Sequence, residues 1–244
     1  MSARAWRALA AADSRILFRD PLLGWVLLLP LSVALMLRVL IPAITNALAS
    51  NGFRLEPFYP LIVSGYLMTA PGIVGMVVGF MLLDERDART FSALRVTPLS
   101  IRHYLAYRVT TPLIAGTLMT LAAYPLVGLT PMPLSVLLPI TVVGGISAPT
   151  MALMLAIAAP NKVAGFAVVK VLNIINLLPL VAYFVPMPIQ LFAGILPSFW
   201  PMRAFWAAAD GEPYLPFIVA GAMAGLVATL FAARLFERRL GTRA

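Results

Sequence analysis

Six stretches of mostly apolar residues, each about as long as a membrane-spanning helix, constrain this chain most strongly. A spanning helix needs about 20 consecutive apolar residues. The candidate spans are 22–41, 58–83, 109–129, 134–159, 163–184 and 215–236. Charged residues make up only 11% of the chain, too few to cover a globule in water. We therefore expect an all-α integral membrane protein with six transmembrane helices.

The basic residues divide unevenly between the two sides of these spans. If both termini are cytoplasmic, fourteen of the 18 Lys and Arg residues lie on the cytoplasmic side, and only Arg38, Arg54 and Arg203 lie on the other. Basic residues gather on the cytoplasmic side of membrane proteins, so the sequence predicts cytoplasmic N- and C-termini. The net charge of +9 follows from this orientation and does not call for a nucleic-acid partner. The preference for Arg over Lys hints at a GC-rich bacterial genome, hence at a bacterial inner membrane.

Residues 1–21 precede the first span and have a helical pattern with two unlike sides. Trp6, Leu9 and Leu17 fall on one side and basic residues on the other, although Asp13 interrupts the apolar side. We predict an interfacial helix along the inner leaflet. The alternative is a frayed basic leader that only anchors the orientation. Residues 22–244 would then form a single six-helix transmembrane domain.

The segment 185–214 is apolar and aromatic, but prolines divide it into pieces too short to span. These prolines are Pro186, Pro188, Pro197, Pro201 and Pro213. Short apolar pieces of this kind are typical of re-entrant or interfacial half-helices. We expect outer half-helices here, and an ordinary loop resting on the membrane surface is the alternative.

The spans lack the groups that most membrane catalysts need. All nine acidic residues lie outside or at the edges of the predicted spans, the chain has no cysteine, and His103 is its one histidine. Proton-coupled carriers and intramembrane hydrolases usually depend on such groups at depth. No phosphate-binding P-loop pattern occurs either. We expect no catalytic residue, metal or cofactor on this chain, and energy for any active transport would come from another polypeptide.

The fifth predicted span carries a polar stripe. Lys170, Asn173 and Asn176 share an arc of roughly 120° on a helix. The stripe could face a substrate path or a partner helix. Alternatively, Lys170 could simply extend its ammonium group to the inner surface.

Pairs of glycines separated by three residues occur in two spans, Gly75 with Gly79 and Gly221 with Gly225. Small residues at this spacing let helix backbones approach closely. We expect them to pack helices within the chain rather than to form a dedicated dimer contact.

The cytoplasmic loop 84–108 is unusually rich in charge. Asp84, Glu85 and Asp87 suit the start of a short helix, where acids oppose the positive end of the helix dipole. Phe91 and Leu94 would give this helix one apolar edge. A short charged helix held between two spans could transmit force from a soluble partner, whereas the alternative is a solvated connection.

A second helix is predicted to begin within the same loop. Thr97 can cap it and Pro98 suits its first position, and it would run through His103 and Arg108 into the third span.

The loop resembles the intracellular loop of the ABC transporter type-2 permease family. The residues that carry the resemblance are Glu85-Arg86-Asp87, Thr90, Leu94 and Thr97-Pro98-Leu99-Ser100. Arg89 departs from the pattern, because the family often has glycine there. The order of elements is also similar, from an interfacial helix through six spans to a proline-aromatic segment before the last. Within the family, the chain looks most like bacterial drug-export permeases of the fluoroquinolone-exporter kind.

The resemblance implies a transport subunit rather than an enzyme. Two permease subunits, identical or related, would pair with two ATP-binding subunits, which would hold the ATP and Mg. Loop 84–95 would be the coupling helix that docks on the ATPase. The residues expected to couple are Glu85, Arg86, Asp87, Arg89, Thr90, Phe91 and Leu94. An amphipathic drug or lipid would be the exported substrate, and Lys170, Asn173 and Asn176 are candidates for its path. A lipid-processing enzyme and a non-transporting anchor subunit are the alternatives.

Overall fold

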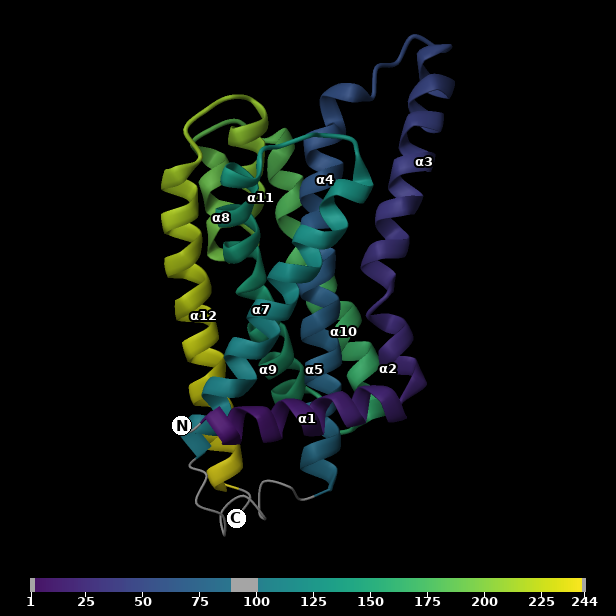
Figure 1. The fold of residues 1–244 in the computed structure, drawn as a ribbon. Helices are drawn as coiled ribbons and strands as arrows, with labels where there is room; N and C mark the ends of the chain where they lie inside the picture. The colour runs from purple at the N-terminus through teal and green to yellow at the C-terminus, as the bar shows by residue number, and fades with distance from the viewer. Residues whose placement is uncertain (1–2, 89–100, 243–244) are drawn as a thin grey trace.

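The computed structural model describes residues 3–88 and 101–242, and all the regular elements in these ranges are helical (Figure 1). Within these ranges, six helical segments are long and apolar enough to cross a membrane. They are Leu23–Ala49, Glu56–Asp87, His103–Val127, Leu134–Ala158, Lys162–Phe184 and Leu215–Arg239. The prediction of an all-α protein with six spanning helices is confirmed, and the chain is a multi-pass membrane protein. The first segment runs eight residues beyond the predicted end at Ile41, because Pro42 is accommodated inside the helix.

Several spans consist of two consecutive helices. The first span contains α2 (Pro21–Val26) and α3 (Leu29–Ala49), and the second contains η1 (Glu56–Phe58), α4 (Tyr59–Leu67) and α5 (Thr69–Asp87). The third is α7 (Ile101–Val127), and the fourth contains α8 (Leu134–Gly145) and α9 (Ser147–Ala158). The fifth contains α10 (Lys162–Leu177) and η2 (Leu178–Phe184), and the sixth is α12 (Leu215–Thr242). The described elements outside the spans are α1 (Ala3–Arg19), η3 (Ile189–Ile195) and α11 (Phe199–Ala209).

Three of the breaks within spans have a common cause. Proline has no N–H to donate to the carbonyl four residues earlier, and its ring crowds that carbonyl. The helices α2, α4 and α8 end at Val26, Leu67 and Gly145, in each case four residues before a proline. Other prolines stay inside continuous helices, among them Pro112 and Pro125 in α7. Three prolines therefore divide spans without ending them, and others leave their helices continuous.

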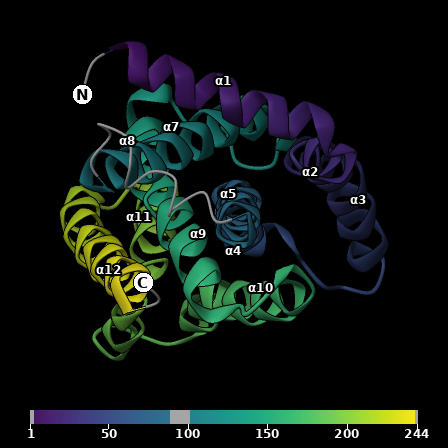
Figure 2. The ribbon, with the colours of Figure 1, turned by 90° about the horizontal axis from the view of Figure 1, so that it is seen from below.

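The second and fourth spans form the centre of the bundle. About 78% of the most apolar window of each is buried, against 17–33% for the other four. Figure 2 shows α4 and α5 in the middle, with α3, α7, α9 and α10 around them. Gly75 brings α5 close to α9, because a Cβ atom at this position would lie 2.5 Å from the Ala148 carbonyl oxygen. Gly221 and Gly225 likewise pack against Trp200 and Ile146 of the same chain, as expected.

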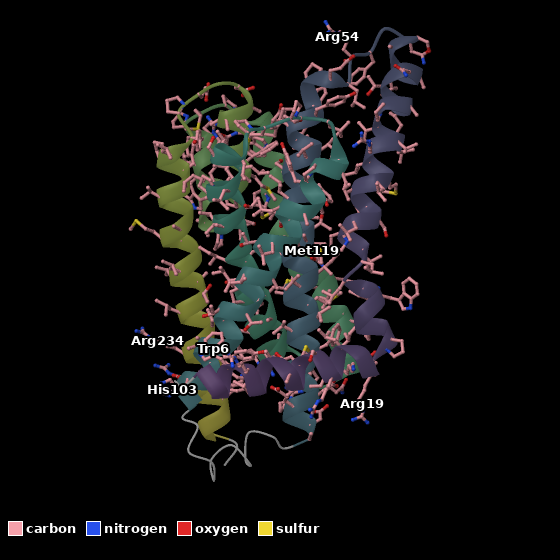
Figure 3. The ribbon with its side chains drawn as sticks, viewed as in Figure 1. Trp6, Arg19, Arg54, His103, Met119 and Arg234 are labelled. Atoms are coloured by element: carbon pink, nitrogen blue, oxygen red, sulfur yellow. The ribbon has the colours of Figure 1, made fainter. Side chains whose placement is uncertain are left out.

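Helix α1 lies across one end of the bundle, roughly perpendicular to the spans (Figure 1). Its apolar side packs against the protein: Trp6 meets the ring of Tyr107 edge-on, and Leu9 joins a cluster formed by α5, α7, α9 and α12. Figure 3 shows Arg19, His103 and Arg234 at this end and Arg54 at the opposite end. Arg19 and Arg234, which the sequence places on the cytoplasmic side, therefore lie at the opposite end of the bundle from Arg54, which it places on the other side.

The second half of the segment before the last span is packed inside the protein, whereas η3 is largely exposed. Helix α11 contacts α4, α8 and α12, and its buried side chains include Phe199, Phe205 and Trp206. The Trp206 indole donates a hydrogen bond to the Ser64 hydroxyl of α4 at 2.7 Å. The segment thus consists of two short helical pieces, η3 and α11, with Pro197 in the turn between them.

Candidate functional site

The acidic and basic group at 84–87 forms the last turn of α5, not the start of a separate short helix. The helical pattern continues without a break, and the Ala88 amide still bonds the Asp84 carbonyl at 2.9 Å. The expectation that these acids begin a helix is therefore wrong. Acids at a helix C-terminus face the negative end of the dipole, which costs only about 0.3–1 kcal/mol each. Asp84 and Glu85 offset that cost by pairing with cations of other helices.

Arg108 of α7 is the centre of a buried polar cluster near α1. Only 2% of its side chain is exposed. Its guanidinium pairs with Asp13 of α1 at 2.9 Å and with Glu85 of α5. Its Nε donates to the Tyr104 hydroxyl at 2.8 Å. Together with Tyr107, these residues form what we call the Arg108 cluster.

Both carboxylates of the Arg108 cluster also accept a tyrosine hydroxyl. Tyr104 donates to Glu85, and Tyr107 donates to Asp13 at 2.7 Å. Removing one partner of a buried ion pair typically costs about 3–5 kcal/mol, because the other charge is left uncompensated. The cluster therefore fixes α1, α5 and α7 to one another.

A second, more exposed ion-pair group lies nearby. The Lys162 ammonium contacts Asp20 at 3.2 Å and Asp84 at 3.0 Å. These residues join the corner between α1 and α2 to the end of α5 and the start of α10. About a third of each side chain is exposed, so each pair contributes less than the Arg108 pairs.

Arg86 holds the C-terminal end of α9. Its guanidinium donates to the carbonyl oxygens of Ala156, Ala159 and Pro160, at 3.2, 2.8 and 2.7 Å. Arg239 of α12 donates to the Ile157 carbonyl oxygen of the same turn. Positive charge at a helix C-terminus is favourable, and here it also satisfies carbonyl groups that have no partner within the helix.

The predicted coupling residues thus fall into two groups. Glu85 and Arg86 point into the bundle, whereas Asp87 is about half exposed, with Arg86 at 3.6 Å. Arg89, Thr90, Phe91 and Leu94 lie outside the described residues, as does the Thr97-Pro98 pair.

Sequence reasoning missed Asp13 and Arg108 as partners. The sequence does contain one signal, because Asp13 is a single acid on the apolar side of α1. In the structure, Asp13 lies there because it pairs with Arg108.

The polar stripe of α10 is divided in the structure. Lys170 is exposed on α10, whereas Asn173 and Asn176 are half-buried and turn towards α5. A Cβ atom at Gly72 of α5 would lie 3.3 Å from the Asn173 side-chain oxygen. The two asparagines therefore face the bundle, and Lys170 does not share their surroundings.

Asn176 also lines a groove of about 270 Å³. Its walls come from α8, α9, α10, α12 and the turn that leads into α11. The lining residues are Val143, Gly144, Ile146, Ser147, Thr150, Met151, Met154, Leu172, Ile175, Asn176, Leu196, Pro197, Ser198, Pro201, Gly225 and Ala228. None of these lining residues is charged. Within the described ranges, no group of three His, Asp or Glu residues is arranged to hold a metal ion.

Comparisons with known proteins agree with this architecture. A protein-family model described as "Fluoroquinolones export permease protein Rv2686c-like" matches residues 13–233. Two similar proteins are the fluoroquinolones export permease proteins MT2760 and Rv2686c, from Mycobacterium tuberculosis strains CDC 1551 / Oshkosh and ATCC 25618 / H37Rv. Each is 36% identical over 227 residues, which cover 91% of this chain and 90% of the relative. No solved structure matches the chain. The predicted likeness to drug-export permeases is confirmed: the chain belongs to the Rv2686c-like family of export permeases and is a membrane transport subunit rather than an enzyme.

Proposed function

We propose that the chain is the permease of an ATP-driven exporter for amphipathic drugs of the fluoroquinolone class. A separate ATP-binding cassette subunit holds the ATP and Mg, and a second copy or a related permease completes the pathway. The chain lies in the bacterial inner membrane with α1 and both termini on the cytoplasmic side. The names of the relatives support the substrate class, and the distribution of basic residues supports the orientation.

The Arg108 cluster is the observation that carries the coupling part of this proposal. Residues 89–100 connect the end of α5 to the start of α7, and Glu85 and Arg108 tie these two helices together beside that connection. A force applied to the connection by an ATPase would therefore move α5 and α7 as one unit. Because α5 lies in the centre of the bundle, that motion would reach the transport pathway.

Helix α1 joins the same unit through two separate contacts. Asp13 pairs with Arg108, and Asp20 pairs with Lys162 at the start of α10. An interfacial helix fixed in this way would move along the membrane surface together with α5 and α7. At the opposite end, η3 and α11 would act as re-entrant half-helices that form an outer gate.

The test is co-purification of the chain with its candidate ATPase, followed by ATP hydrolysis and drug export in the same vesicles. We expect Phe91→Ala to weaken ATPase binding. We expect Glu85→Gln to keep ATPase binding but reduce the drug exported per ATP hydrolysed. Arg15→Ala, on the exposed side of α1, is the matched control and should keep both activities.

Failure to recruit any ATPase would contradict the proposal. Recruitment without drug export would indicate an anchor subunit instead.

A further inference from the structure

The groove lined by Asn176 lies near the middle of the membrane-spanning bundle. Ile146, which lines it, separates α8 and α9, and each of these helices has 12 residues. The turn Leu196-Pro197-Ser198 contributes to the wall as well, together with Pro201 in the first turn of α11. The groove is therefore placed among the central fourth span, two outer spans and the inner tip of the η3–α11 segment.

Two of the four polar residues in the wall are already satisfied. The Ser147 hydroxyl donates to the Gly144 carbonyl at 2.7 Å. Thr150 bonds the Ile146 carbonyl at 3.1 Å and the Thr229 hydroxyl at 2.8 Å. These hydroxyls therefore stabilise the helices and need no further partner.

Ser198 and Asn176 differ from that pair. Ser198 is 4% exposed, yet its side chain makes no capping bond to α11 and no other hydrogen bond within the described part of the chain. The Asn176 amide likewise has no hydrogen-bond partner among the described residues. Unsatisfied polar groups inside a membrane protein are costly, since lipid tails cannot replace the missing bond. Their persistence in one groove points to a ligand.

The position of Ser198 indicates which ligand group it would receive. Ser198 is the residue before the first turn of the eleven-residue helix α11, where the helix dipole places partial positive charge. A ligand oxygen that accepts hydrogen bonds would be stabilised by this field, by the serine hydroxyl and by the Asn176 amide. No lining residue carries a charge, so the groove offers hydrogen bonds and apolar contact but no counter-ion.

Groove size and wall chemistry define the rest of the ligand. Drug-sized sites usually have volumes of about 300–1,000 Å³, so about 270 Å³ holds a compact ring system rather than a whole drug. A lipid acyl chain would fill the apolar walls but leave Ser198 and Asn176 without partners. An aromatic ring system that bears a carbonyl group satisfies both requirements.

We propose that this groove binds the carbonyl-bearing aromatic body of the exported drug, with Ser198 and Asn176 as its hydrogen-bonding residues. The proposal rests on the proposed function for the identity of the ligand class, because it specifies where the permease holds its substrate. It does not depend on the ATPase.

The experiment measures binding of a fluorescent fluoroquinolone, norfloxacin, to the full-length chain in phospholipid nanodiscs without an ATPase. Ser198→Ala and Asn176→Leu should each raise the Kd about three- to tenfold, as expected for one lost hydrogen bond. Ala228→Leu adds bulk to the groove wall and should raise the Kd at least as much. Val227→Leu, next to it but 67% exposed and outside the groove, is the matched control and should leave the Kd unchanged. Thermal melting of each variant checks that it is folded.

Several results would overturn the groove as the substrate site. One is wild-type affinity in both folded polar variants. Others are an equal loss in the Val227→Leu control and the absence of saturable norfloxacin binding to the wild type. A phospholipid that native mass spectrometry finds retained by the wild type, released by Ala228→Leu and not displaced by norfloxacin would assign the groove to lipid instead.

The two proposals can fail separately. Norfloxacin binding that depends on Ser198 in a chain that recruits no ATPase would support the groove and contradict ATP-driven export. ATP-coupled export that is unaffected by folded Ser198→Ala and Asn176→Leu variants would support the export function and overturn the groove.

Discussion

The Arg108 cluster and the groove both place polar side chains inside an apolar bundle, but they satisfy them differently. In the Arg108 cluster, each carboxylate receives the guanidinium and a tyrosine hydroxyl. In the groove, Ser198 and Asn176 have no partner among the described residues. A fully paired buried group contributes to holding helices together, whereas an unpaired one costs stability. The first region therefore holds helices together, and the second offers unpaired polar groups to the ligand that we propose.

Arg108→Leu should give the largest loss of stability. It leaves Asp13 and Glu85 as buried carboxylates without a cation, so we expect the free energy of unfolding to fall by about 3–5 kcal/mol. Unfolding in mixed micelles, followed by circular dichroism, measures this. Arg15→Leu, on the exposed side of α1, should change it by less than about 0.5 kcal/mol. Equal stability of the two variants would show that the cluster does not hold the helices.

Gly75→Ala should give the next largest effect. It tests the close packing of α5 against α9, which involves no charge. The new Cβ atom would lie 2.5 Å from the Ala148 backbone oxygen, which has no freedom to move aside. Overpacking of this kind costs about 1–3 kcal/mol. At Gly24 the nearest such contact is 3.6 Å, so Gly24→Ala should be tolerated. The free energy of unfolding is measured as for Arg108→Leu. If both glycine variants were as stable as the wild type, the close approach of α5 and α9 would be contradicted.

Lys162→Met should have a smaller effect than Arg108→Leu, although it also removes the cation from two carboxylates. The pairs of Lys162 are about one-third exposed, so we expect a loss of at most about 1 kcal/mol. The loss should shrink when NaCl is raised from 0.1 to 1 M, because salt screens exposed charges. Lys170→Met, on the exposed face of α10, is the control and should cost nothing. A salt-independent loss as large as that of Arg108→Leu would remove the distinction between the two ion-pair groups.

Ser198→Ala should have the smallest effect on folding. Its hydroxyl makes no hydrogen bond within the described part of the chain, so the free energy of unfolding should stay within about 0.5 kcal/mol of the wild type. Thermal melting in the absence of drug measures this directly. Thr150→Val, at a hydroxyl that does bond Thr229, should cost about 0.6 kcal/mol, as is typical of hydrogen bonds between membrane helices. A larger loss for Ser198→Ala than for Thr150→Val would show that Ser198 has a structural role.

The six spans could be predicted because their signal is local. Each needs only a sufficient run of apolar residues, and neighbouring residues supply it. Breaks within spans were harder to place, since Pro71 and Pro149 divide their spans, whereas Pro112 and Pro125 stay inside a continuous helix. Whether a proline divides a span depends on the helices packed around it, which the sequence does not reveal.

The error at residues 84–87 has a specific physical cause. The helix-dipole term favours acids at a helix start, and on that basis the sequence predicts a helix start at Asp84 and Glu85. Their pairing with Lys162 and Arg108 is stronger than that term, and those partners lie 78 and 23 residues further along the chain. A local rule fails where a distant ion pair outweighs it.

By itself, the sequence determined that lipid surrounds most of the chain, that the fold is helical, and how many spans it has. Backbone groups in lipid must be satisfied within each segment, so apolar length alone specifies a helix. Only the tertiary structure decided which polar side chains are partnered. Asp13 and Arg108 are 95 residues apart and meet because α1 folds across the end of the bundle. Ser198 reaches the groove because η3 and α11 fold back into the bundle, bringing a serine from outside the spans to their middle.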